Sequence, residues 1–337
     1  MDIFSTSLML KAVDNSPSSN KFLTKRFFPI EQTSITEEVH FDLITRRRRL
    51  APFVSPVVAG QIVKSNGYTT KTFKPAYIKD KRIFDSERPL KRLSGETIGG
   101  TYKPGYRVAK ILVQEIQDQI DMVDRRLEVM AAEILTTGSV TIEGDQYPLV
   151  NIDFGRDPAL TLTLTGVNKW NDPTSHPLDD LQDWAQLVLK KSCVYPSDVV
   201  MSIDVWKVFK KHPDVSAELA RLRSSSTLQP NAIDVEGGAF MGTIDGFNVY
   251  VYSSWYINDN DVEQPLFPDK TIVMSSPKML GVKAFGPIRD EELGFQPIPY
   301  FPKSWTEHDP SIRYLMMQSA PLLVPTIVNA SLSASVI

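Results

Sequence analysis

The residues whose types could do chemistry are few and widely separated. Four consecutive arginines, Arg46, Arg47, Arg48 and Arg49, stand directly before the apolar stretch LAPFVSP. A block of like charge this dense is typical of a solvated segment that contacts a partner of opposite sign. The guanidinium groups could neutralise the phosphates of a nucleic acid, which would make binding strongly salt-dependent. The run is not accompanied by a helix-turn-helix pattern, a zinc finger or interleaved aromatic and basic residues. It therefore does not predict sequence-specific recognition of bases.

Other reactive or ligating residues do not converge on a site. Four scattered histidines are expected in loops or at the surface: His40, His176, His212 and His308. The stretch EGGAFMGTIDG, residues 236–246, lacks the Lys and Ser or Thr of a phosphate-binding loop, which favours a mobile loop. NDNDVE, residues 258–263, lacks the glycine and the final glutamate of a calcium loop and is expected to be a hydrated turn between strands. Cys193, the single cysteine, is expected to be small and buried at a helix end. The sequence predicts no catalytic residue, cofactor or metal.

Composition and charge narrow the class of protein. The 337 residues are 42% hydrophobic and 23% charged, as in globular proteins, with length for about two domains. No stretch predicts a signal peptide or a membrane span, so we expect a soluble cytoplasmic protein. Residues 46–110 hold 16 Lys and Arg against four acids, and residues 111–183 hold four against 14, balances of +12 and −10. The opposite charges of two such segments can pair within one subunit or between copies.

A long helix is the clearest structural element to be expected. Pro104 and Gly105 precede it and Gly138 ends it, which predicts a helix over residues 106–137. An apolar stripe recurs at alternating spacings of four and three: Ile116, Ile120, Val123, Leu127, Met130 and Ile134. The opposite face is acidic: Glu115, Asp118, Asp121, Asp124 and Glu128. The stripe is too short to indicate a coiled coil, so we expect a spine packed across a sheet.

Residues 50–92 are predicted to form a long two-stranded hairpin. VVAGQIVKS and YTTKTFKPAYIKDKRIF are rich in β-branched and aromatic residues, and the turn signal SNG separates them. An isolated hairpin is marginally stable in water, so this one must lie on another surface. Further strands are predicted at residues 39–43, 139–154 and 311–328, and an α/β unit at 168–308.

Four stretches resemble a known family. They are FVSPVVAGQIVKSNG at 53–67, IDFGR at 152–156, LFPDKTIVM at 266–274 and YFPKSWTEHDPSIRYLMMQSAPLLVP at 300–325. In order and spacing they resemble the major capsid proteins of lambda-like tailed bacteriophages, and the resemblance covers essentially the whole chain. It implies the Hong Kong 97-type capsid fold, an α+β fold, and a structural protein rather than an enzyme.

The resemblance also divides the chain into segments. It implies an N-terminal arm at 1–45, an extended loop (E-loop) hairpin at 46–95, a peripheral domain at 96–167, an axial domain at 168–308 and further peripheral strands at 309–337. The arm is too short for the fused scaffolding domain of some relatives, which implies a separate scaffold. Lys-Asn crosslinks, found in some members of the fold, are not expected, because this branch uses a small decoration protein.

The function implied by the resemblance is self-assembly. Pentamers and hexamers would form an icosahedral head around packaged double-stranded DNA, with a decoration protein, a scaffold and a portal as partners and no membrane. Assembly would take place in the bacterial host cytoplasm and end in the virion capsid. A DNA-binding accessory protein that uses the four arginines is the alternative.

The resemblance names two groups of contact residues. Intersubunit contacts are expected from the arginine run and the E-loop: Arg46, Arg47, Arg48, Arg49, Phe53, Val54, Lys64, Tyr68, Phe73, Lys74 and Tyr77. A loop at the capsomer axis is expected to include Glu236, Gly237, Gly238, Phe240 and Met241.

Overall fold

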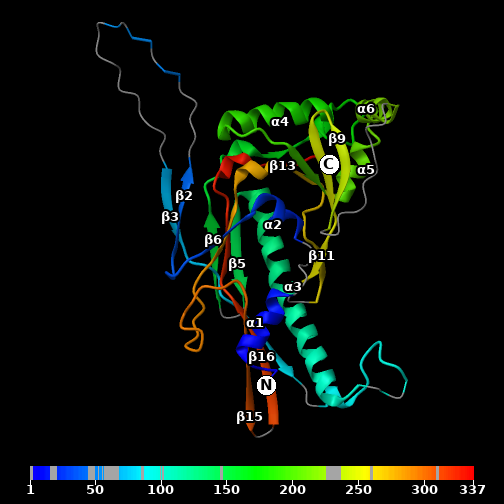
Figure 1. Cartoon of the computed structure of the whole chain (residues 1–337). Helices are drawn as coiled ribbons and strands as arrows, with labels where there is room; N and C mark the ends of the chain where they lie inside the picture. The colour runs from blue at the N-terminus through cyan, green and yellow to red at the C-terminus, as the bar shows by residue number, and fades with distance from the viewer. Residues whose placement is uncertain are drawn as a thin grey trace.

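The computed structural model shows one long helix with sheets along it and an α/β unit at one end (Figure 1). It describes residues 3–15, 21–44, 50–51, 53–54, 56, 68–84, 87–98, 100, 102–144, 147–224, 237–258, 261–308 and 311–337. The arginines at 46–49, Lys64 and Glu236 lie outside the described residues.

The long helix α3, Pro104–Thr137, confirms the predicted spine. Its 34 residues span about 51 Å at 1.5 Å per residue. Pro104 begins it, and Gly138 ends it with φ 80°, a left-handed conformation that glycine adopts without strain. The predicted apolar stripe is buried along its whole length. The spacing of apolar residues in the sequence therefore predicts both the helix and the face that it buries.

Two sheets pack along α3. Near its N-terminal half lies an antiparallel sheet in the order β15-β16-β4, with bounds Phe301–His308, Ser311–Ser319 and Ile78–Phe84. Phe84 and Leu315 face the helix there, in a core that also includes Met9 of α1, Thr6–Asp14. Near the C-terminal half lies a sheet in the order β1-β14-β17, with bounds Ile30–Thr33, Val282–Phe285 and Pro321–Val324.

The α/β unit is built on a six-stranded sheet. Its order is β7-β18-β13-β8-β10-β9, with bounds Thr161–Thr163, Leu332–Ser335, Thr271–Ser275, Asp198–Met201, Phe247–Tyr252 and Gly238–Ile244. Its helices are α4 (Pro177–Ser192), α5 (Ile203–Phe209) and α6 (Pro213–Ser224). Cys193 caps α4 in a left-handed conformation with φ 60°, and it is half-buried, not buried as predicted.

Three hairpins and one short helix complete the fold. The hairpins are β2–β3 (Val39–Ile44 and Tyr68–Phe73), β5–β6 (Ser139–Gly144 and Tyr147–Asp153) and β11–β12 (Trp255–Ile257 and Glu263–Pro265). The last confirms that residues 258–263 turn between two strands. The short helix α2, Phe22–Phe27, lies in the core shared by α3 and the sheets.

The strand pairing bears on only one half of the predicted hairpin at 50–92. β3 pairs with β2, which the resemblance places in the N-terminal arm, and β4 pairs with β16. Pro75 lies between β3 and β4 and cannot donate to a ladder, so the predicted continuous strand is interrupted there. The stretch at 57–65 lies outside the described residues.

Strands inside the predicted axial domain, residues 168–308, also pair with strands outside it. β14 and β15 join sheets with strands from both ends of the sequence, whereas β18 enters the six-stranded sheet. Period-two patterns predict that a segment is a strand, and they carry no information on its distant partner. The domain limits therefore remain predictions.

Candidate functional site

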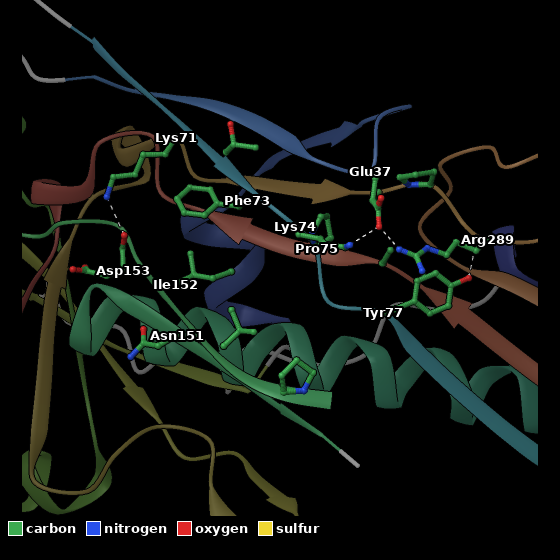
Figure 2. Close-up of a pocket in the computed structure, with 16 residues that line it drawn as sticks. Glu37, Lys71, Phe73, Lys74, Pro75, Tyr77, Asn151, Ile152, Asp153 and Arg289 are labelled. Atoms are coloured by element: carbon green, nitrogen blue, oxygen red, sulfur yellow. Dashed lines mark hydrogen bonds and ion pairs between the residues drawn. The ribbon is translucent and has the colours of Figure 1, made fainter. Parts of the chain in front are cut away.

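A cavity of about 770 Å³ lies at the foot of the β2–β3 hairpin (Figure 2). Its walls come from the end of β3 and the chain after it, from β6, and from the loop that follows β14. Three residues predicted as intersubunit contacts, Phe73, Lys74 and Tyr77, lie together in its lining. This is where the structure gathers the sequence-predicted residues.

Glu37 connects the hairpin to the loop after β14. Its carboxylate lies 2.5 Å from Lys74 Nζ and also pairs with Arg289 (Figure 2). Hydrogen bonding to Lys74 and then the Arg289 charge hold the pKa of Glu37 below its ordinary value. All three side chains are more than half exposed, so the ion pairs orient the hairpin more than they stabilise the fold.

Phe73 and Tyr77 fix the same foot through packing and hydrogen bonds. The Tyr77 hydroxyl donates to Gln318 Oε1 at 2.7 Å and accepts from the Arg289 backbone N–H at 3.0 Å. Burial raises the pKa of Tyr77. The Phe73 ring meets Phe154 edge-on at a centroid distance of 5.3 Å. The structure thus places these predicted contact residues in contacts within one subunit, and their contact with a neighbour stays a prediction.

The remaining predicted E-loop residues are not brought together. Phe53 is fully exposed and Val54 is half-buried. Tyr68 begins β3, and only its backbone is described. The predicted E-loop contact residues therefore fall into two groups. Phe73, Lys74 and Tyr77 lie together at the foot of the β2–β3 hairpin, whereas Phe53 lies in an exposed apolar stretch.

The predicted capsomer-axis loop is instead mostly a strand. Gly238, Phe240 and Met241 belong to β9, which pairs antiparallel with β10. Gly238 is buried, and a Cβ there would lie 2.5 Å from the Phe22 ring. The sequence signal overlooked is Asp245 and Gly246, whose φ of 50° and 83° form the Asp-Gly hairpin turn. The glycines therefore serve packing and a turn, which corrects the prediction of a mobile loop.

The acidic face of α3 holds the polar residues that sequence reasoning missed. Asp124 and Glu128 are fully buried rather than solvated. Asp124 pairs with Lys21 Nζ at 2.7 Å and accepts from the Tyr300 hydroxyl.

Glu128 binds the N-terminus of α2. Its carboxylate accepts from the backbone N–H groups of Leu23 at 2.6 Å and Thr24 at 3.0 Å, and from the Thr24 hydroxyl at 2.9 Å. The Tyr252 hydroxyl of β10 donates to it at 3.1 Å. Burial outweighs these hydrogen bonds and raises the pKa of Glu128. One carboxylate thus joins the spine, the N-terminal segment and the α/β unit.

Part of the charge complementarity is satisfied within the subunit. Arg82 Nη1 of β4 lies 2.8 Å from Glu115 and 3.8 Å from Asp118, both on α3. Arg88 also pairs with Glu115. Burial raises the pKa of Glu115, but hydrogen bonds from the two arginines outweigh it and lower that pKa overall. The basic and acidic segments therefore meet first inside one chain.

The histidines do not form a site. His40 bonds across the hairpin to Thr72 at 2.8 Å, and His176 is exposed. His212 is buried, contrary to the prediction, because the turn between α5 and α6 packs it beneath the surface. The side chain of His308 lies outside the described residues. Among the described residues, no three His, Cys, Asp or Glu side chains are grouped to hold a metal ion.

A family model for phage major capsid protein E matches residues 5–336. The chain belongs to this family of phage major capsid proteins. The capsid protein is 28% identical to the major capsid protein of Escherichia phage lambda over 333 residues, 96% of each chain. It is 27% identical to the major capsid protein of Escherichia phage N15 over 333 residues, again 96% of each. These relatives confirm the resemblance.

Solved structures show the fold of the capsid protein. A capsid protein from an Escherichia coli CFT073 prophage aligns with a TM-score of 0.77 at 21% identity, covering 98% of this chain and 99% of that one. The capsid of Ralstonia phage GP4 aligns with a TM-score of 0.54 at 12% identity, covering 95% and 92%. The fold is thus the Hong Kong 97-type, α+β capsid fold.

Family and fold together settle the general function. The protein is the major capsid protein of a tailed phage, a virion component whose copies form the icosahedral head shell. Within the described ranges, no helix is both long and apolar enough to span a lipid bilayer.

Proposed function

We propose that this capsid protein assembles with itself into pentamers and hexamers, with the segment between β2 and β3 lying on a neighbouring subunit. The observation that carries the proposal is the exposure of Leu50 and Phe53, at 94% and 106%. Large apolar side chains in an assembling protein are covered when a partner binds. Because a shell is built from many copies of one protein, a second copy is always present as that partner.

The finer roles follow from a closed shell around a genome. The head encloses packaged double-stranded DNA without reading its sequence, and a small decoration protein, a scaffold and a portal act with it. Assembly takes place in the bacterial host cytoplasm, and the protein's role is structural rather than enzymatic. Support comes from the family of structural capsid proteins to which the chain belongs.

The arginines at 46–49 are assigned to an acidic protein surface at a subunit boundary. The support is the chain's own acidic segment at 111–183. Only part of its negative charge is paired with Arg82 and Arg88 within the subunit. The alternative, a DNA-binding accessory role, relies on the same four residues. Tight DNA binding by a monomeric preparation would favour that alternative.

Negative-stain electron microscopy of the purified or scaffold-co-expressed protein tests the proposal. Closed shells, or rings with five-fold and six-fold symmetry, are the expected result. A monodisperse monomer under all conditions of salt, pH and co-expression would contradict it.

A further inference from the structure

An irregular loop before α3 is held by a buried ion pair. Glu96 and Arg107, which lies in the first turn of α3, are 3% and 9% exposed. Glu96 Oε1 accepts from Arg107 Nη2 at 2.8 Å, and Glu96 Oε2 accepts from Arg107 Nε at 3.1 Å. This two-point geometry is the strongest form of a carboxylate and guanidinium pair. It attaches a loop without regular strands to a rigid helix.

The same carboxylate organises the loop backbone. Glu96 accepts from the backbone N–H groups of Tyr102 at 2.8 Å and Leu93 at 3.1 Å. Arg107 Nη1 also donates to the Pro89 carbonyl at 3.3 Å. A Cβ on Gly100 would lie 2.7 Å from Arg107 Nη2, so the backbone approaches the guanidinium as closely as only glycine allows. The loop is therefore built to one shape.

The built loop and the first turns of α3 present apolar side chains to water. We name residues 87–113, apart from 99 and 101, the knob. Its exposed apolar side chains are Leu90 at 71%, Ile98 at 98%, Tyr106 at 55% and Val113 at 50%. A rigid loop that holds such side chains outward is pre-organised for a partner, because the entropy of ordering it is lost before binding.

Charge indicates what the partner looks like. Besides Glu96 and Arg107, two further ion pairs are closed within the subunit, Arg88 with Glu115 and Lys91 with Glu87. The described part of the knob keeps an excess of basic charge on Arg92, Lys103 and Lys110. A complementary surface must therefore be apolar and acidic.

The β5–β6 hairpin of this same chain has that character. Leu149 and Val150 are 68% and 37% exposed. Glu143 is also exposed and follows Ile142, which pairs with Val150 across the hairpin. The knob lies at the N-terminal end of α3, whereas β5 begins directly after its C-terminal end (Figure 1). The knob and the start of β5 are therefore separated by the length of α3, about 51 Å.

We propose that the knob of one copy docks on the β5–β6 hairpin of the next copy. The contact is head-to-tail, and such contacts close into rings when the rotation between copies allows it. The inference rests on the proposed self-assembly and names one of its surfaces.

The main test substitutes Ile98→Asp in the full chain and measures shells by electron microscopy and sedimentation. We expect at least a tenfold loss of assembled material, because a charge replaces an apolar contact. Ile35→Asp is the matched control, since Ile35 is also exposed, at 83%, and lies outside the knob. Circular dichroism of each variant shows whether the monomer is folded.

A charge swap tests the choice of partner surface. Lys103→Glu should reduce assembly several-fold, and Glu143→Lys in the same chain should restore it partly. A folded Ile98→Asp protein that assembles like wild type overturns the inference while leaving the proposed function intact. Loss of assembly without rescue by Glu143→Lys overturns the hairpin as the partner. A wild-type protein that forms no oligomer contradicts the proposed function itself.

Discussion

At the scale of single residues, the buried carboxylates decide how the subunit holds together. Glu128 accepts hydrogen bonds from α2 and from β10, so it joins segments more than 100 positions apart in the sequence. A carboxylate without water needs several donors to remain in the interior. Glu128 therefore acts as a junction that no hydrophobic residue could replace.

Glu128→Ala should lower the free energy of unfolding by about 3 kcal/mol. The substitution leaves the backbone N–H groups of Leu23 and Thr24 buried without an acceptor, and each such group costs about 1–3 kcal/mol. Urea unfolding of unassembled protein, followed by circular dichroism, measures it. Asp118→Ala on the same helix is the control, because Asp118 is 67% exposed. Equal effects of the two substitutions would contradict the role given to Glu128.

Glu96 makes the knob sensitive to strong acid. The hydrogen bond from Arg107 is the main cause that lowers the pKa of Glu96 to about 2. A lowered pKa contributes stability that is complete above the ordinary value of 4.5 and is lost as the pH falls toward about 2. The protection factors of the Leu93 and Tyr102 amides against hydrogen exchange should therefore fall across that window. In Glu96→Gln the exchange should be faster at neutral pH and should lack this acid transition.

At the scale of elements, the sequence predicted periodic structure well and pairing poorly. The spacing of the apolar stripe and the flanking Pro104 and Gly138 were enough to define α3. The pairing of β3 with β2 could not be found this way, because a period-two pattern predicts a strand but not its partner. The burial of Asp124 and Glu128 on the acidic face could not be predicted, because a helical period shows a face but not what covers it.

The C-terminus of α3 offers a sharp test of backbone geometry. Gly138 and Gly246 have φ of 80° and 83°, so Ala at either position carries the left-handed cost of about 1–2 kcal/mol. At Gly138 the new Cβ would also lie 2.5 Å from Arg156 Cβ, whereas at Gly246 nothing lies within 4 Å. Gly138→Ala should thus destabilise by ~1–3 kcal/mol more than Gly246→Ala in urea unfolding. Equal losses would show that Arg156 moves aside freely.

At the scale of the whole molecule, opposed charge is divided between folding and assembly. Arg82 and Arg88 meet the acidic segment inside the subunit. The arginines at 46–49 and Arg92, Lys103 and Lys110 of the knob remain for contacts between copies under the proposals above. Composition predicted that oppositely charged segments would meet, but not which residues form the candidate surfaces. A count of charges does not tell which ion pairs form within one subunit.

Replacing the four arginines at 46–49 together by Ala should impair shell assembly several-fold. Wild-type assembly should also weaken as salt rises, since attraction between exposed charges is screened beyond about 8 Å at physiological ionic strength. Light scattering during assembly measures both effects. The control removes four exposed lysines elsewhere: Lys190, Lys210, Lys211 and Lys278. Normal shells from the arginine variant would remove these residues from the contact.

The position of β18 has a consequence for how the protein is made. β18, residues 332–335, lies between β7 and β13, which are encoded far earlier. Because the six-stranded sheet needs β18, it cannot be completed until residue 335 has left the ribosome. The α/β unit of a nascent chain therefore stays incomplete until then, which delays its association with other copies. Protease resistance of the α/β unit in ribosome-stalled chains should appear only when stalling lies beyond residue 335 by the length of the exit tunnel.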